Sequence, residues 1–194
     1  WGKSRLGRSM HLVDELPREI VGSYPWLLVI TAWNSVVTGR HTHVTALLDR
    51  AEEAIPTYLE RRHRNGEDEA RTAERGRLAG IIAAIRAYQA QMERSYPEAV
   101  ALALEARNLL DPESGGLWNT VSLMLAISYI LQGDYASGDE VLEQTMQEGL
   151  RQGATNVIGL PTTYRCRLRV EWGRLREAER VCAEAIARIE AGDP

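Results

Sequence analysis

Four short segments that each follow a helix-like run share one spacing of small residues around them. The segments begin at Gly39, Arg94, Gly133 and Gly173, which are called the turn residues below. Small side chains recur seven residues before, five after and twelve after each turn residue, and Val44 is the one larger exception. These positions hold Ala32, Ala87, Ala126 and Cys166; Val44, Ala99, Gly138 and Ala178; and Ala51, Ala106, Thr145 and Ala185. Because small residues at fixed intervals let two helices cross closely, the spacing predicts four antiparallel helix pairs.

The helices of these pairs are expected to flank the turns. Apolar residues at helical spacing place them at 25–38 and 43–54, 67–92 and 97–110, 117–132 and 135–152, and 156–172 and 175–191. Pro161 moves the true start of the seventh helix toward itself, and Pro56 is expected to close or kink the second helix before an irregular junction at 57–66. A short lead-in helix at 11–21 is interrupted by Pro17. No stretch alternates polar and apolar residues strictly over five positions, so no β-strand is expected.

The predicted fold is therefore all-α: a right-handed superhelix of about four antiparallel helix pairs in one domain, 1–194. Its parts are a lead-in at 1–24 and pairs at 25–64, 65–112, 113–153 and 154–194. Three turn residues are glycine, which enters the left-handed conformation without strain. Arg94 either takes that conformation at a cost of about 1 kcal/mol or belongs to a different kind of turn.

Composition narrows the class of function. The net charge of -4 gives no general attraction to nucleic acid, so no direct nucleic-acid contact is expected. The longest apolar run, 26–30, is far shorter than the roughly 20 residues that span a bilayer. Cys166 and Cys182 both lie at inward positions of the pattern, which predicts buried free thiols rather than a disulfide. The chain begins at Trp1 and stops just after a complete pair, so we expect a fragment of a longer cytoplasmic protein.

The small residues and the turn Gly133-Asp134-Tyr135 resemble the tetratricopeptide repeat, and Pro56 falls where that repeat has its closing proline. A narrower resemblance is to the repeat region of MalT-like regulators, bacterial signalling ATPases that end in a LuxR-type DNA-binding domain. It is carried by Leu16-Pro17, Tyr24-Pro25-Trp26-Leu27, Thr31-Ala32-Trp33, Thr38-Gly39-Arg40, Ala83-Ala84-Ile85-Arg86-Ala87, Ala99-Val100-Ala101-Leu102-Ala103 and Ala106.

The resemblance implies a sensor segment that binds an effector on a concave face and signals to ATPase and DNA-binding domains elsewhere in the protein. The effector would be a small-molecule inducer or a protein or peptide, with no cofactor in this segment. The alternative is a general tetratricopeptide-like scaffold that binds proteins only. Self-association is also expected, because Val181 and Ile189 of the last helix would be exposed.

If the pairs stack as tetratricopeptide repeats do, the first helix of each pair lines the concave face. The candidate ligand-binding residues are then Trp26, Trp33, Tyr88, Gln91, Thr120, Thr163, Arg167 and Glu171. Aromatic rings beside guanidinium and amide groups suit a polar ligand such as a sugar, and suit a peptide equally well. Two structural roles stay open as alternatives to ligand binding. Trp33 and Tyr88 would pack between helices, and Arg165 and Arg169 would form ion pairs with Glu171, Glu177 or Glu179.

Other motifs favour ordinary surface roles. Gly2-Lys3-Ser4 lacks the strand and the earlier glycine of a phosphate-binding loop. His41 and His43 are two residues apart, whereas histidine ligands on a helix prefer a spacing of four. The basic run 61–64 is followed at once by acidic residues, as on a solvated surface. No catalytic or metal-binding set is recognisable, so we expect a protein that is not an enzyme.

Overall fold

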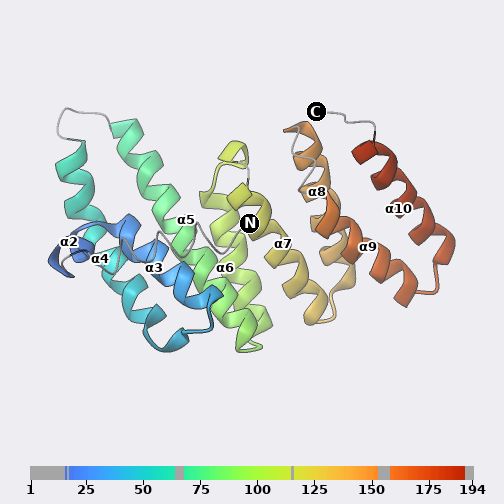
Figure 1. Cartoon of the computed structure of the whole chain (residues 1–194), viewed down its shortest axis with the longest axis horizontal. Helices are drawn as coiled ribbons and strands as arrows, with labels where there is room; N and C mark the ends of the chain where they lie inside the picture. Colours follow the sequence, from blue (N-terminus) through green and yellow to red (C-terminus); the bar gives the residue numbers. More distant parts are fainter. Residues whose placement is uncertain (1–15, 17, 64–67, 115, 153–157, 191–194) are drawn as a thin grey trace. The chain divides into compact units, whose positions relative to one another are not determined.

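The computed structural model describes residues 16, 18–63, 68–114, 116–152 and 158–190. Within these residues the regular structure is entirely helical and includes no strand, as the sequence predicts. The chain divides into two compact units, Trp1–Gln89 and Ala90–Pro194, which are described one at a time (Figure 1). The right-handed superhelix stays a prediction.

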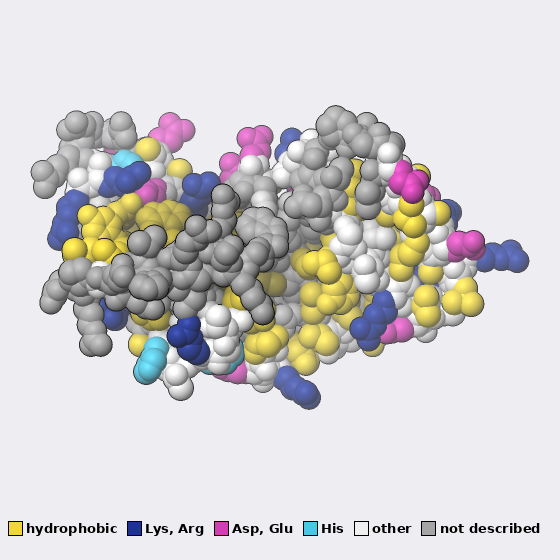
Figure 2. All heavy atoms as spheres, viewed as in Figure 1, with side chains coloured by type: hydrophobic (Ala, Val, Ile, Leu, Met, Phe, Trp, Pro, Cys, Tyr) yellow, Lys and Arg dark blue, Asp and Glu magenta, His cyan; other side chains and the backbone are white. Residues whose placement is uncertain are grey.

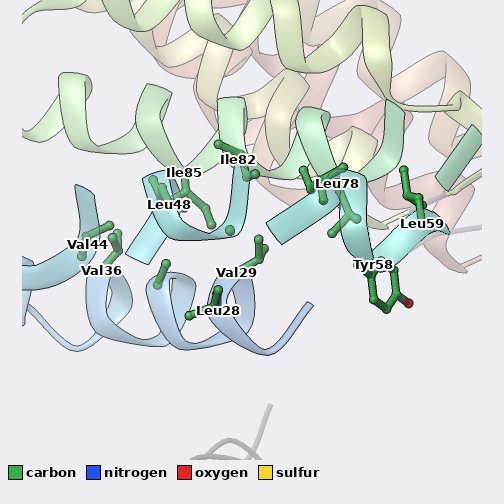
Figure 3. Close-up of a cluster of buried hydrophobic side chains, with 13 residues drawn as sticks. Leu28, Val29, Val36, Val44, Leu48, Tyr58, Leu59, Leu78, Ile82 and Ile85 are labelled. Carbon is green, nitrogen blue, oxygen red and sulfur yellow. The ribbon is translucent and has the colours of Figure 1, made fainter. Parts of the chain in front are cut away.

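Unit 1 is built from α2 (Arg18–Ser23), α3 (Pro25–Val37), the 3-10 turn η1 (His41–His43), α4 (Val44–Arg62) and most of α5 (Asp68–Met92). α3 packs along α4, and α2 contacts both of them. The apolar faces of α3 and α4 pack against α5 in one core, in which Leu28, Leu48, Leu78 and Ile85 are completely buried (Figure 3). Burying side chains of this size contributes roughly 1.5–3 kcal/mol each, which holds the three helices together.

Unit 2 contains the end of α5, α6 (Tyr96–Leu109), the 3-10 turn η2 (Pro112–Ser114), α7 (Gly116–Leu131), α8 (Tyr135–Arg151), α9 (Gly159–Glu171) and α10 (Leu175–Glu190). Each of the helices α6 to α9 packs against the next one along the chain. Leu125, Leu142 and Leu168 are among the fully buried side chains of α7, α8 and α9. Sequential packing of this kind makes each helix depend mainly on its neighbours in sequence.

All four turn residues have left-handed backbone conformations. Gly39, Gly133 and Gly173 have φ of 76°, 92° and 73°, and Arg94 has φ of 62°. The turn residue donates its N–H to the carbonyl three residues earlier, and the next residue donates to the carbonyl five residues earlier; at Arg94 these N–O distances are 3.2 and 2.8 Å. The same two bonds form at the three glycine turns, so each is a Schellman motif. Arg94 thus takes the left-handed conformation rather than a different turn.

The small positions around the turns are shielded from solvent. Eleven of the twelve are buried, and Cys166 is half-buried. Gly138 shows why size matters, because a Cβ there would lie 2.7 Å from Ile130 Cγ1 and 3.1 Å from the Ala126 carbonyl oxygen. Close packing of the two helices is therefore confirmed for the pairs α3–α4, α7–α8 and α9–α10.

The expectation that Pro56 closes the second helix is wrong. α4 continues through Pro56 to Arg62, so residues 57–62 are helical and not an irregular junction. Proline has no N–H, so the backbone carbonyl four residues before Pro56 lacks its usual helix donor. Because Pro56 is exposed, water can donate a hydrogen bond to that carbonyl instead. Ile55, Tyr58 and Leu59 are buried on the opposite side, and this packing outweighs the roughly 3 kcal/mol that an interior proline costs. The other described helix ends lie close to their predicted positions, with α9 starting at Gly159.

The expectation of buried free thiols is also wrong. Cys166 of α9 and Cys182 of α10 are half-buried and joined in a disulfide, with Cα atoms 6.7 Å apart. Both residues were correctly placed on the facing sides of a helix pair. What the spacing could not show is that their side chains lie opposite each other, because that depends on the rotation of each helix about its axis.

Candidate functional site

Two arginines of α9 converge on one carboxylate of α8. Arg165 donates through Nε to Asp139 Oδ1 at 3.1 Å, and Arg169 donates through both terminal nitrogens, one of them to Oδ2 at 2.6 Å. Arg165 also pairs with Glu143. Both guanidinium groups are largely buried, with side chains 12% and 11% exposed. Ion pairing of Arg165 and Arg169 was anticipated, but with Glu171, Glu177 or Glu179; their partners here lie on the preceding helix.

This network sets the protonation of Asp139. Burial alone would raise the pKa of its carboxyl, but the hydrogen bonds and charges of Arg169 and Arg165 outweigh burial and hold the pKa below its ordinary value. Asp139 therefore stays ionised at neutral pH, and both of its oxygens are already engaged. Such a carboxylate fastens α8 to α9 and is poorly placed to act as a general base.

The same arginines form one wall of a pocket of about 200 Å³ between α8, α9 and α10. It is lined by Glu143, Met146, Arg165, Arg169, Glu177, Arg180, Val181, Glu184, Ala185 and Arg188. The lining contains four arginines and three glutamates. Asp139, which pairs with two of these arginines, adds a fourth negative charge, so the charges around the pocket balance. The lining offers hydrogen-bonding groups of both signs over a small apolar floor, and it contains no nucleophilic side chain.

A second cluster, in unit 1, surrounds the carboxylate of Glu74 on α5. Oε1 accepts hydrogen bonds from Trp26 Nε1 at 3.1 Å and from the Tyr58 hydroxyl at 3.0 Å. Oε2 lies 2.7 Å from His63 Nε2 and 3.2 Å from Arg62 Nε. α3, α4 and the residue that follows α4 are thus all tied to one carboxylate of α5.

The cluster shifts the protonation of its members. Burial alone would raise the pKa of Glu74, but hydrogen bonds from His63, Trp26 and Tyr58 and the charge of Arg62 hold it below its ordinary value. Burial and the bond to Glu74 raise the pKa of Tyr58. Glu74 has donors on both oxygens, which makes it a structural anchor of unit 1.

The candidate residues of unit 1 occupy two different places. Trp26 belongs to the Glu74 cluster. Trp33 of α3 and Tyr88 of α5 contact each other edge to face, with ring centroids 6.3 Å apart, and both stay half-buried. Their contact supports the helix-packing alternative, while their exposed edges leave the ligand-binding prediction open.

The candidate residues of unit 2 do not form a single cluster. Gln91 is buried and donates to the Ser128 hydroxyl at 3.2 Å. Thr120 and Thr163 are exposed, and their hydroxyls bond to the carbonyls one turn earlier in their own helices. Arg167 and Glu171 are exposed and pair with each other at 2.9 Å. On α9 the side chains of Thr163, Arg167 and Glu171 follow one another at intervals of one turn.

One helix position connects several of these residues. Six residues before the turn residue, the first helix of each pair carries Trp33, Tyr88, Ile127 or Arg167. The first three are half-buried and Arg167 is exposed, whereas the position one residue later is buried in three of the four helices. In three of the four first helices this position is therefore less buried than the one after it.

The remaining motifs offer no additional site. His41 and His43 are exposed in η1, and among the described residues no group of three acidic, histidine or cysteine side chains is arranged to bind a metal ion. Arg61 is exposed, and Arg62 pairs with Glu74. Gly2-Lys3-Ser4 and His11 lie outside the described residues.

The sequence interpretation missed Glu74, Tyr58, His63 and Asp139. The spacing of Tyr58 at i+3 from Ile55 was a usable signal that α4 continues, and it would have placed Tyr58 on the buried face of the helix. Glu74 and Asp139 gave no such signal, since their donors come from residues up to 48 positions away.

Among the described residues, none of the helices combines the length and hydrophobicity that crossing a membrane requires. Comparison with known proteins found no matching family model, no similar curated protein and no similar solved structure.

Proposed function

We propose that this chain is the effector-sensing helical-repeat segment of a MalT-like transcription regulator and that it acts in the cytoplasm. The observation that carries the proposal is the repetition of one Schellman turn, with small residues buried at the same offsets on both sides. Such repetition is the hallmark of helical arrays, whose usual task is binding. The resemblance in 16–40 and 83–106 narrows that task to signal reception.

The proposed effector is a small polar molecule such as a sugar, bound on the first helices of the pairs. In unit 1 the half-buried rings of Trp33 and Tyr88 offer apolar faces and edges. In unit 2 the row of Thr163, Arg167 and Glu171 on α9 offers hydrogen-bonding groups of both signs. Rings and charged groups of these kinds are used in sites for sugars and other polar ligands.

A thermal-shift screen of sugars and small metabolites against the whole chain tests the proposal. An effector at a hundred times its dissociation constant should stabilise the fold by about 2.7 kcal/mol. The shift should be lost in Trp33→Leu if the effector binds unit 1, and in Arg167→Ala if it binds α9 of unit 2. It should persist in the control Arg176→Ala, which changes an exposed arginine of α10. The small-molecule proposal fails if no compound gives a saturable shift.

The second candidate function is a scaffold that binds proteins only. It is favoured by the exposure of large apolar side chains beside Arg167, since Leu160 and Val170 of α9 are 60% and 53% exposed. A negative small-molecule screen, together with capture of a peptide by this face, would support it. The regulator context has its own test: the gene should encode a nucleotide-binding P-loop before this segment and a helix-turn-helix after it.

A further inference from the structure

The second helix of a pair contacts the first helix of the next pair, and the contacting residues can be numbered from the turn residue. In unit 2, α9 packs on α8, where Asp139, Glu143 and Met146 lie six, ten and thirteen residues after Gly133. Asp139 and Glu143 bind Arg165, and Met146 is buried to 7% exposure. These three positions are called the docking positions of a second helix.

Docking positions also contact the next helix in two other pairs, through different side chains. In α4 the second and third are Asp49 and Glu52, and both bind Arg86 of α5, at 3.0 and 2.8 Å. In α6 the third is Arg107, whose guanidinium lies 4.6 Å from the centre of the Trp118 ring of α7. Arg86 and Arg165 both stand eight residues before their own turn residues, but Arg165 pairs with the first and second docking positions and Arg86 with the second and third.

The docking positions of α10 are Glu179, Ala183 and Ile186, and all three are exposed. Ile186 is 55% exposed, whereas Met146 at the equivalent position of α8 is 7% exposed. Leu175, on the same side of α10, is 63% exposed. Figure 2 shows apolar, acidic and basic side chains together over the α9–α10 part of unit 2.

We propose that this face of α10 binds an amphipathic helix of a partner protein that carries a basic residue opposite Glu179 and an apolar residue opposite Ile186. Charge complementarity supports a basic partner, because the equivalent Asp139 attracts two arginines. Among the described residues no ion pair involves Glu179.

A second copy of the chain fits the face less well. The first helix of its first pair is α3, and the positions equivalent to Arg165 and Arg169 are Thr31 and Ser35. Both hydroxyls are used within α3, in bonds to the carbonyls of Leu27 and Thr31. α3 therefore offers no positive charge to Glu179.

The test uses fluorescence polarisation with a labelled helical peptide of residues 159–172 in which Cys166→Ser removes the thiol. This peptide carries Arg165 and Arg169 at the required spacing. The peptide should bind the whole chain saturably. Glu179→Arg should weaken binding on the order of tenfold, as expected for a close charge pair. A peptide with glutamate at both arginine positions should bind the Glu179→Arg variant better than it binds the parent chain.

Ile186→Glu should abolish binding, while Leu160→Glu, a matched change on α9, should leave it unchanged. Absence of binding, equal binding of the two peptides, or equal loss in Leu160→Glu would overturn the proposal. If light scattering shows that the parent chain is a dimer and that Ile186→Glu is a monomer, the face binds a second copy of the chain and the proposal is overturned. These results are independent of the small-molecule screen, which concerns a different face.

Discussion

Replacing Arg94 by glycine should stabilise the protein, because Arg94 occupies the one turn position where a side chain opposes the backbone conformation. Its φ is 62°, and the three equivalent residues are glycines. A left-handed conformation costs a residue with a Cβ roughly 1–2 kcal/mol. Glycine loses about 0.5–1 kcal/mol more backbone entropy on folding than alanine does. The difference predicts that Arg94→Gly gains about 0.5–1 kcal/mol, or a rise in Tm of about 1–4 °C for a chain of this length.

Urea denaturation followed by circular dichroism measures this change. Arg94→Ala removes the charge but keeps a Cβ, so its stability should stay within about 0.5 kcal/mol of the parent. Gly133→Ala is the reverse substitution in the same unit. Its Cβ would meet no atom within 4 Å, so the loss of about 1 kcal/mol or more would come from the backbone alone. Destabilisation by Arg94→Gly, or an equal gain in Arg94→Ala, would refute the reasoning.

Three further substitutions test the contacts within the units. Glu74→Gln should cost roughly 1–3 kcal/mol in denaturant unfolding, because donors to both oxygens lose the charge they bind. Since the folded pKa of Glu74 is lowered, its contribution should be complete above its unfolded pKa and lost as pH falls through the folded value; a pH-independent effect would contradict this. Asp139→Asn should cost roughly 2–4 kcal/mol, between the values for exposed and buried pairs, and a cost no greater than that of Glu140→Gln would argue against the network. Gly138→Ala should destabilise by about 1–2 kcal/mol through the contact with Ile130, and calorimetry showing an unchanged Tm would disprove the close crossing.

The helix pairs could be predicted from sequence because their information is local. A glycine that ends a helix and a small residue five positions later lie within two helical turns, so spacing alone indicates them. Arg94 shows the strength of this pattern, since the turn forms there although the favoured residue is missing. Pro56 shows its limit, because local preference predicted a break and burial of Ile55 and Tyr58 kept the helix intact.

The polar clusters could not be predicted in the same way. Glu74 binds residues from two other helices, and one acidic residue among the many in α4 and α5 carries no mark of that role. The ion pairs of Arg165 were anticipated in kind but placed on the wrong helix, because spacing reveals neighbours along a helix and not across helices. Trp26 was assigned to a groove, and only the position of Glu74 shows that its indole N–H is already bonded.

The Schellman turns have a consequence for how proteins of this type can diversify. The turn residues 39 and 94 are 55 positions apart and the later ones 39 and 40, yet the corner after each first helix keeps the same hydrogen bonds. The additional length lies in α4 and α5, 19 and 25 residues long, at the ends remote from those corners. Insertions at those ends can lengthen a helix pair without altering the hydrogen bonds of its Schellman turn. Additional surface for recognition can therefore form there while the turn stays the same.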